Sequence, residues 1–201
     1  MLTIMLAFLY LPSSNQEIKF MKGKLATALQ YTKHFATTGA ISETSREVEI
    51  EICNNIALDG KVLVEFGMGL GNITKEILER MPKDAKLYSF EVNQEFCEKV
   101  KESIQDERLI IINDGAENIK NYVEGEVDNF ISSMPFTFFS KEKTELILGT
   151  SKELLKNGGF FSQILYSKIH TKKFAGIWEN YDIVKTNNFP AGYIYHCSKN
   201  S

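Results

Sequence analysis

One short segment constrains the fold of this chain more than any other. It runs from Lys61 to Lys75 and reads KVLVEFGMGLGNITK. An apolar run ends in an acidic residue, three glycines follow at alternate positions, and a helical pattern then begins. A strand, a glycine-rich turn and a helix in this order are typical of an α/β sheet that binds a nucleoside-like ligand at its edge.

Size and composition limit the classes of protein to consider. The chain has 201 residues, which suits one α/β domain. Its formal net charge of -3 argues against broad electrostatic binding of nucleic acid. The cysteines Cys53, Cys97 and Cys197 are odd in number and form no CxxC pair. We therefore expect no disulfide framework and no metal site, and we expect a cytoplasmic protein.

Residues 1–60 are expected to form an N-terminal helical extension and lid. Residues 1–11 are apolar but too few to cross a bilayer, which takes about 20 residues, and they lack the basic flank of a signal peptide. The alternative is that translation begins at Met21 rather than at Met1. From Ser14 the spacing predicts an amphipathic helix rimmed by lysines, which either lies on an anionic membrane surface or covers part of the core. A second helix is expected from Thr44 to Asp59-Gly60.

From residue 61 to residue 201 the pattern alternates between strands and helices, which indicates a single domain. Strands separated by helices of this length need right-handed crossovers, and they therefore form a parallel sheet. The last two strands lie too close for a crossover and are expected to pair antiparallel. The predicted strands cover residues 61–66, 86–92, 109–113, 127–133, 160–166, 181–185 and 192–197.

The ligand is expected beyond the carboxyl ends of these strands. Gly67, Gly69 and Gly71 let the backbone approach a ligand closely. Asn72 stands where a dinucleotide loop needs glycine, and a pyrophosphate favours a helix N-terminus without the negative charge of Glu65 nearby. That carboxylate suits a ligand with positive charge, such as an amino group or a sulfonium.

Two further acids follow the next strands. Glu91 ends the second strand about 20 residues past the glycine loop, where a carboxylate can accept hydrogen bonds from both ribose hydroxyls. Asp114 ends the third strand and could accept a hydrogen bond from an exocyclic adenine amine, while Gly115 and Ala116 leave room for the flat ring. A solvated strand end and an ordinary Asp-Gly turn are the simpler interpretations of these acids.

The reacting end of a bound nucleoside is expected at the end of the fourth strand. Ser132, Ser133, Pro135 and Phe136 are the candidate catalytic residues of that segment, since Pro135 fixes the backbone and Phe136 can wall a pocket. Tyr31 could reach the pocket if the first helix folds over it. A strand that ends at proline and enters a buried aromatic turn is the alternative.

These motifs resemble those of class I S-adenosylmethionine-dependent methyltransferases, over residues 61–197. The resemblance implies a Rossmann-like sheet of order 3-2-1-4-5-7-6 with strand seven antiparallel, and S-adenosylmethionine as the cofactor. The cofactor residues it implies are Glu65, Gly67, Gly69, Gly71, Glu91, Asp114, Gly115 and Ala116.

Four segments carry a narrower resemblance to bacterial phospholipid N-methyltransferases, relatives of the rRNA adenine dimethyltransferases. They are residues 35–41 (FATTGAI), 132–136 (SSMPF), 159–166 (GFFSQILY) and 188–191 (NFPA). This likeness implies a neutral phosphatidylethanolamine amine that attacks the methyl group in line, a cofactor contact at Gly39, and peripheral docking on the inner face of the membrane.

Three alternatives stay open. An rRNA adenine methyltransferase is disfavoured because Ser132 and Ser133 replace the Asn or Asp that those relatives carry before their proline pair. A small-molecule or protein methyltransferase is compatible with the same cofactor motifs. A non-catalytic S-adenosylmethionine-binding module agrees less well with intact Glu65, Gly67, Gly69 and Glu91.

Overall fold

The computed structural model describes residues 45–136, 139–166, 171–187 and 191–199. The chain divides between residues 42 and 43, and the second unit, Glu43–Ser201, holds all of the described residues. Tyr31, Gly39 and the lysine-rimmed helix predicted from Ser14 lie outside the described residues, so their proposed roles stay predictions.

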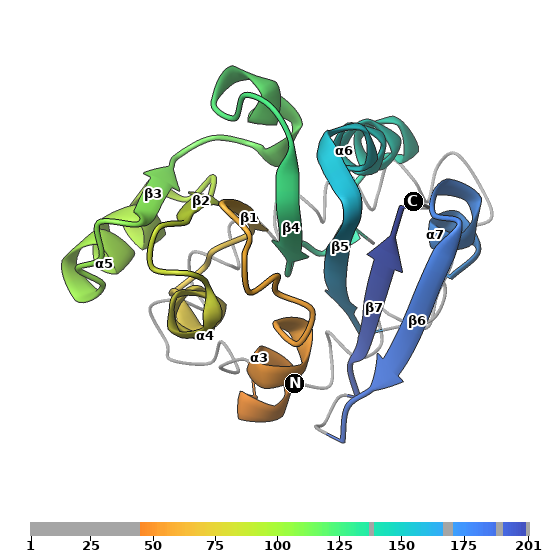
Figure 1. Ribbon diagram of the computed structural model, residues 1–201, viewed down its shortest axis with the longest axis horizontal. Helices are drawn as coiled ribbons and strands as arrows, with labels where there is room; N and C mark the ends of the chain where they lie inside the picture. The colour runs from red at the N-terminus through yellow and green to blue at the C-terminus, as the bar shows by residue number, and fades with distance from the viewer. Residues whose placement is uncertain (1–44, 137–138, 167–170, 188–190, 200–201) are drawn as a thin grey trace, which may run out of the picture. The chain divides into compact units, whose positions relative to one another are not determined.

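A seven-stranded sheet of order β3-β2-β1-β4-β5-β7-β6 forms the centre of this unit. Figure 1 shows it running from β3 at one side to β6 at the other. The pairs from β3 to β5 are parallel, and β7 runs antiparallel to both β5 and β6. The predicted strand order and the antiparallel seventh strand are thus confirmed. The strands are β1 (Val62–Phe66), β2 (Lys86–Phe90), β3 (Leu109–Ile112), β4 (Val127–Ser132), β5 (Leu155–Leu165), β6 (Asn180–Lys185) and β7 (Tyr193–Ser198).

Helices cover both faces of the sheet. Asn93 and Ser140 cap two of them, since their side chains accept hydrogen bonds from the backbone N–H groups of Glu95 and Lys143. The 3₁₀-helix η1 and the helix α7 were not predicted from the sequence. The helices are α3 (Arg46–Ile52), α4 (Asn72–Arg80), α5 (Gln94–Ser103), η1 (Ala116–Asn121), α6 (Lys141–Leu154) and α7 (Thr171–Ile177).

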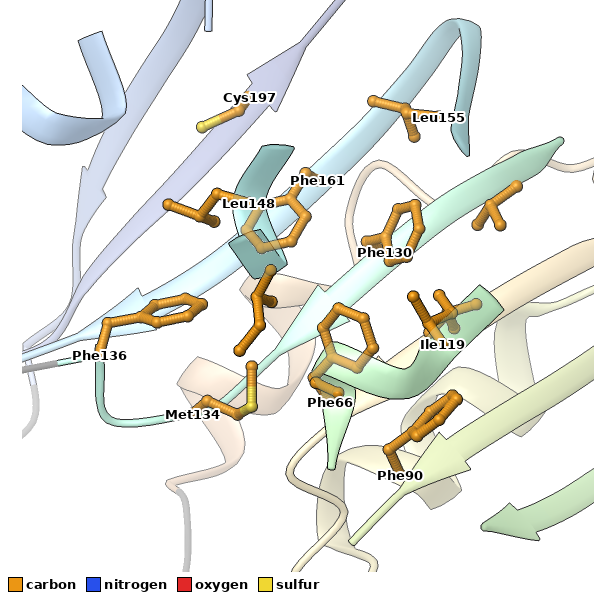
Figure 2. Close-up of a cluster of buried hydrophobic side chains, with 14 of the residues drawn as sticks. Phe66, Phe90, Ile119, Phe130, Met134, Phe136, Leu148, Leu155, Phe161 and Cys197 are labelled. Carbon is orange, nitrogen blue, oxygen red and sulfur yellow. The ribbon is translucent and has the colours of Figure 1, made fainter. Parts of the chain in front are cut away.

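The sheet separates two hydrophobic clusters. Alternate residues of β1 face opposite sides, so that Leu63 packs with α3 and α4 whereas Val64 and Phe66 pack with η1, α6 and α7. The second cluster is shown in Figure 2, where aromatic side chains such as Phe90 and Phe130 lie beside Phe66. Because both faces are covered, every residue of the central strand β4 is buried, rather than alternate ones.

Two predicted boundaries were wrong by five residues or more, and each of these errors has a physical reason. The second helix ends at Ile52 rather than at Asp59-Gly60. The buried side chain of Asn129 accepts a hydrogen bond from Ala57 N and donates one to Asn55 O, both at 2.8 Å, and these bonds replace helical ones.

The second wrong boundary is the start of β5, which begins at Leu155 rather than at Phe160. Its pairing with β4 shifts register between Val127 and Asn129. A Cβ atom at Gly159 would lie 2.5 Å from the carbonyl oxygen of Asp128, and Gly158 has a φ of 80°. The two glycines therefore form an irregularity inside the strand rather than a turn before it.

Candidate active site

The glycine loop after β1 has one face open to a ligand. Gly67, Gly69 and Gly71 have φ values of 81°, 57° and 85°. A Cβ atom on Gly67 would lie 3.1 Å from Ser133 Oγ, and one on Gly71 would lie 3.0 Å from Ile104 Cδ1. At Gly69 no atom lies within 4 Å of that position. Packing thus requires the two outer glycines, whereas the middle one borders open space.

Hydrogen bonds tie the loop to the end of β2. The N–H groups of Gly67 and Met68 donate to the carbonyl oxygen of Phe90, at 2.9 and 3.1 Å. Gly69 N donates to Glu91 Oε2 at 3.0 Å, and Asn93 N donates to Glu91 Oε1 at 2.9 Å. The structure therefore brings Glu91 against the open glycine. Each oxygen atom of the Glu91 carboxylate accepts one of these hydrogen bonds and has capacity for another.

Glu65 lies beneath the loop and is only 2% exposed. Its Oε2 atom accepts hydrogen bonds from Ser89 Oγ at 2.6 Å and Thr74 Oγ1 at 2.8 Å. Burial raises the pKa of Glu65 to about 7, a rise that these two hydroxyls reduce. Its Oε1 atom is buried and has no hydrogen-bond partner among the described residues. An acceptor in that state suits a ligand that brings a donor or a positive charge.

The turn after β3 is organised by Asp114. Its Oδ1 atom accepts hydrogen bonds from Asn118 Nδ2 and Gly115 N, and its Oδ2 atom accepts one from the Tyr122 hydroxyl, all within 2.7–2.8 Å. These bonds, first of all the one from Asn118, lower the pKa of Asp114. Ala116 is buried at the start of η1. Asp114 thus stabilises its own turn, whatever it binds beyond it.

The segment after β4 joins the glycine loop through Ser133. The Ser133 hydroxyl donates to Gly67 O at 2.7 Å, and Ser133 N donates to Phe66 O at 3.0 Å. Ser132 is fully buried, and its oxygen accepts a long bond of 3.4 Å from Met134 N. Ser133 is therefore the serine that the structure brings to the loop.

The other two candidates of this segment differ in burial. Pro135 is exposed. Phe136 is 1% exposed and packs against Phe139 and Phe174, with ring centroids 5.8 and 6.3 Å apart. Figure 2 shows Phe136 among the side chains of the core cluster, near Met134. In the described structure Phe136 is a core residue that anchors the segment after β4.

Several residues of the site were not singled out in the sequence. Val92 follows Glu91 and is 65% exposed, an unusual place for an apolar side chain unless a ligand covers it. Its apolar character right after a strand-end acid was a usable signal. Thr74 and Ser89, which donate hydrogen bonds to Glu65, were also missed. Each is a polar residue inside an apolar pattern, and this could have indicated a buried polar role.

The three cysteines differ in their distance from the loop. Cys53, Cys97 and Cys197 are all free and buried. Cys97 packs with Met68 of the loop, and its Sγ atom donates to the carbonyl oxygen of Glu91 at 3.5 Å. Within the described ranges no cluster of His, Cys, Asp or Glu could hold a metal ion. The helices that the structure describes include none long and apolar enough to cross a membrane.

Known proteins share this domain. A family model described as "Methyltransferase domain" matches residues 63–159. An ornithine lipid N-methyltransferase of Singulisphaera acidiphila is 22% identical over 181 residues, which cover 84% of this chain and 92% of that protein.

Solved structures have the same fold. A precorrin-6y C5,15-methyltransferase of Geobacter metallireducens superposes with a TM-score of 0.66 at 14% identity, over 79% of this chain and 90% of that one. A Streptococcus mutans protein classed as a methyltransferase was solved in complex with SAH (S-adenosylhomocysteine). It superposes with a TM-score of 0.61 at 18% identity, over 78% of this chain and 99% of that one.

Proposed function

We propose that this chain, an S-adenosylmethionine-dependent methyltransferase with the class I fold, methylates the amine of a membrane lipid, with phosphatidylethanolamine as the first substrate to test. The observation that carries the lipid proposal is the extent of one alignment. The match to the ornithine lipid N-methyltransferase spans 84% of the chain and so reaches beyond the domain at residues 63–159. Segments outside the shared domain are those that differ between activities of one fold.

The described residues fit the cofactor. When bound, S-adenosylmethionine supplies a methyl group on a positively charged sulfur. Gly69 leaves space above the loop, and Glu91 beside it has acceptor capacity for ribose hydroxyls. The buried Oε1 atom of Glu65 accepts no hydrogen bond from any described residue, which suits a positively charged ligand.

Ser133 is the chain's best candidate to contact the attacking amine. Its hydroxyl proton is committed to Gly67 O, so its oxygen lone pairs face the remaining directions as acceptors. An acceptor of this kind can orient an N–H bond of a neutral amine. Ser132 is fully buried and less suited to that role. We therefore assign Ser133 to positioning the acceptor, which can supply much of the rate enhancement without a covalent step.

The proposed place of action is the surface of a membrane. The support is the lysine-rimmed pattern that begins at Ser14, which is typical of helices that lie on anionic lipid. In this proposal the enzyme works as a peripheral protein on the cytoplasmic face and takes its lipid substrate from the bilayer.

The test uses the purified full chain, methyl-labelled S-adenosylmethionine and lipid vesicles. Parallel reactions contain phosphatidylethanolamine, ornithine lipid or phosphatidylcholine alone, and a further reaction contains ribosomal RNA. We expect label in a lipid amine and none in phosphatidylcholine or RNA. Absence of labelled lipid, with S-adenosylhomocysteine binding intact, would overturn the lipid proposal and leave the cofactor assignment standing.

A matched pair of variants controls this experiment. Gly69→Asn places a side chain above the loop and is expected to abolish labelling. Gly158→Asn alters another glycine with positive φ and nothing within 4 Å of a Cβ, but inside β5, and is expected to keep it.

A further inference from the structure

Gln163 is a buried amide in an otherwise apolar part of β5. The residue is 0% exposed. Its neighbours on the same face of the strand, Phe161 and Leu165, belong to the hydrophobic cluster shown in Figure 2. Its Oε1 atom is buried and accepts no hydrogen bond from any described residue. An amide that is only partly hydrogen-bonded in the core costs stability, so stability alone does not explain a glutamine here.

The amide nitrogen of Gln163 binds the segment after β4. Its Nε2 atom donates to Met134 O at 3.0 Å and to Ile164 O at 2.7 Å. Two carbonyl neighbours fix the orientation of the amide, because only its nitrogen end can donate. Met134 O also accepts a hydrogen bond from Phe136 N at 3.0 Å, which closes a three-residue turn around Pro135. The Met134 carbonyl therefore accepts two hydrogen bonds, one for each of its lone pairs.

Two neighbouring strands hold this segment from opposite sides. β4 lies between β1 and β5, and Ser132 at its end pairs with Phe66 of β1 and Gln163 of β5. On the β1 side, Ser133 donates hydrogen bonds through both its N–H group and its hydroxyl. On the β5 side, the Gln163 amide holds the next residue, Met134. A displacement of Met134 would displace Ser133 as well, because the two residues are adjacent in the chain.

We propose that Gln163 is a positioning residue for methyl transfer, which fixes the Met134 carbonyl and thereby holds Ser133 in place against the methyl acceptor. Gln163 is fully buried and acts through the segment rather than by contact with the substrate. Such an effect can be large, since a misplacement of about 1 Å can reduce a rate by about 100-fold. The inference rests on the proposed function, through the role given to Ser133, and applies to any amine acceptor.

The first test is Gln163→Met, which fills nearly the same volume and cannot donate a hydrogen bond. It removes two hydrogen bonds together with an unsatisfied oxygen, so we expect a nearly unchanged unfolding temperature. With phosphatidylethanolamine vesicles, we expect kcat to fall by about 10- to 100-fold, while the KM for lipid and the affinity for S-adenosylhomocysteine stay unchanged. A purely structural role predicts the reverse, namely a lower unfolding temperature and an unchanged kcat of the folded protein.

The second test measures amide hydrogen exchange by NMR, with S-adenosylhomocysteine bound and no methyl acceptor. The N–H group of Phe136 closes the turn onto Met134 O, and we expect it to exchange at least about tenfold faster in Gln163→Met. The amides of Gly67 and Met68 in the glycine loop should keep their rates. Gln105→Met is the control, because it makes the same substitution at an exposed position after α5 and should change none of these quantities.

Each result decides for or against the proposal. Unchanged exchange at Phe136 in the folded variant would overturn it, and so would an unchanged kcat. Gln163→Leu takes the place of Gln163→Met if the methionine variant does not fold. A wild-type protein that labels no lipid would refute the lipid proposal alone. The kcat comparison then uses whichever other acceptor takes the label, and if none does, the exchange rate at Phe136 decides.

Discussion

The hydroxyl of Ser133 donates a 2.7 Å hydrogen bond to the carbonyl oxygen of Gly67. This bond connects the segment after β4 to the loop after β1, two strands that pair through Phe66 and Ser132. The cofactor loop and the segment proposed to face the methyl acceptor therefore share one fixed geometry. A change at this bond should alter the reaction more than it alters the fold.

Ser133→Ala tests that relationship. We expect kcat to fall by about 10- to 100-fold because the acceptor is misplaced, and the free energy of unfolding to fall by about 1 kcal/mol. Steady-state kinetics and urea denaturation measure the two effects. Ser103→Ala, at the exposed end of α5, is the control. Unchanged kcat in Ser133→Ala would show that this bond serves the fold alone.

Gly69→Asn should block the cofactor without disturbing the loop. The φ of 57° lies in the left-handed region, which asparagine tolerates better than most residues, and no atom lies within 4 Å of the new Cβ. We expect S-adenosylhomocysteine affinity to fall at least about tenfold, or about 1.4 kcal/mol, with a nearly unchanged unfolding temperature. Normal affinity in this variant, measured by calorimetry, would mean that the ligand does not pass over this glycine.

Glu65→Gln should change how stability depends on pH. The pKa of Glu65 is about 7 in the folded protein, whereas the usual pKa of a glutamate is 4.5. The folded state therefore binds a proton that the unfolded state has lost, so the free energy of unfolding falls as pH rises from about 4.5 to about 7. The total is on the order of 3 kcal/mol. The glutamine variant lacks this decline and should be more stable than wild type at pH 8.

Urea denaturation at a series of pH values from 5 to 8 distinguishes these outcomes. Parallel curves for wild type and Glu65→Gln would contradict the raised pKa. The same variant should also bind S-adenosylmethionine more weakly, since a neutral amide attracts a positive ligand less than a carboxylate does.

His196 should produce a dependence of the opposite sign. It lies buried on β7, where it contacts Ser162 Oγ at 2.8 Å and Glu51 Oε1 at 3.3 Å. Asp182 of β6 is its other charged neighbour, and burial lowers the pKa of His196 below the usual 6.5. The unfolded chain then takes up the proton first, so stability is complete above about pH 6.5 and declines as pH falls below it.

The matching variant is His196→Gln, which can keep hydrogen bonds to both neighbours. It should be less stable than wild type at pH 7.5 by about 1–3 kcal/mol, because a buried hydrogen bond is altered. Below pH 6.5 it should lose stability less steeply than wild type. An equal slope in both proteins, measured by urea denaturation between pH 5 and 7, would argue against a neutral buried histidine.

Much of the sheet could be predicted because its signals are local. Apolar runs between helical patterns located the strands, and the short connection before β7 indicated an antiparallel pair. The end of α3 could not be predicted, since it depends on Asn129 in β4. The start of β5 depends in the same way on the backbone of Asp128. Contacts between residues this far apart leave no mark in a local pattern.

The same difference between local patterns and contacts within the folded chain applies to the site. Spacing was enough to indicate the glycine loop and Glu91, which the structure brings together through Gly69. It was not enough to show that both oxygen atoms of Asp114 already accept hydrogen bonds from Gly115, Asn118 and Tyr122. Which carboxylate oxygens already accept hydrogen bonds depends on how the side chains pack, and the spacing of residues in the sequence does not show it.

The position of β7 between β5 and β6 has a consequence for synthesis of the protein. β5 and β6 both leave the ribosome before β7, and among the described strands β6 pairs with β7 alone. Until Tyr193–Ser198 arrives, the 11-residue β5 presents an open edge, and open edges recruit other chains. A stop codon or a protease cut shortly before Tyr193 would remove the whole of β7, which is far from the glycine loop in sequence, and would leave an aggregation-prone product.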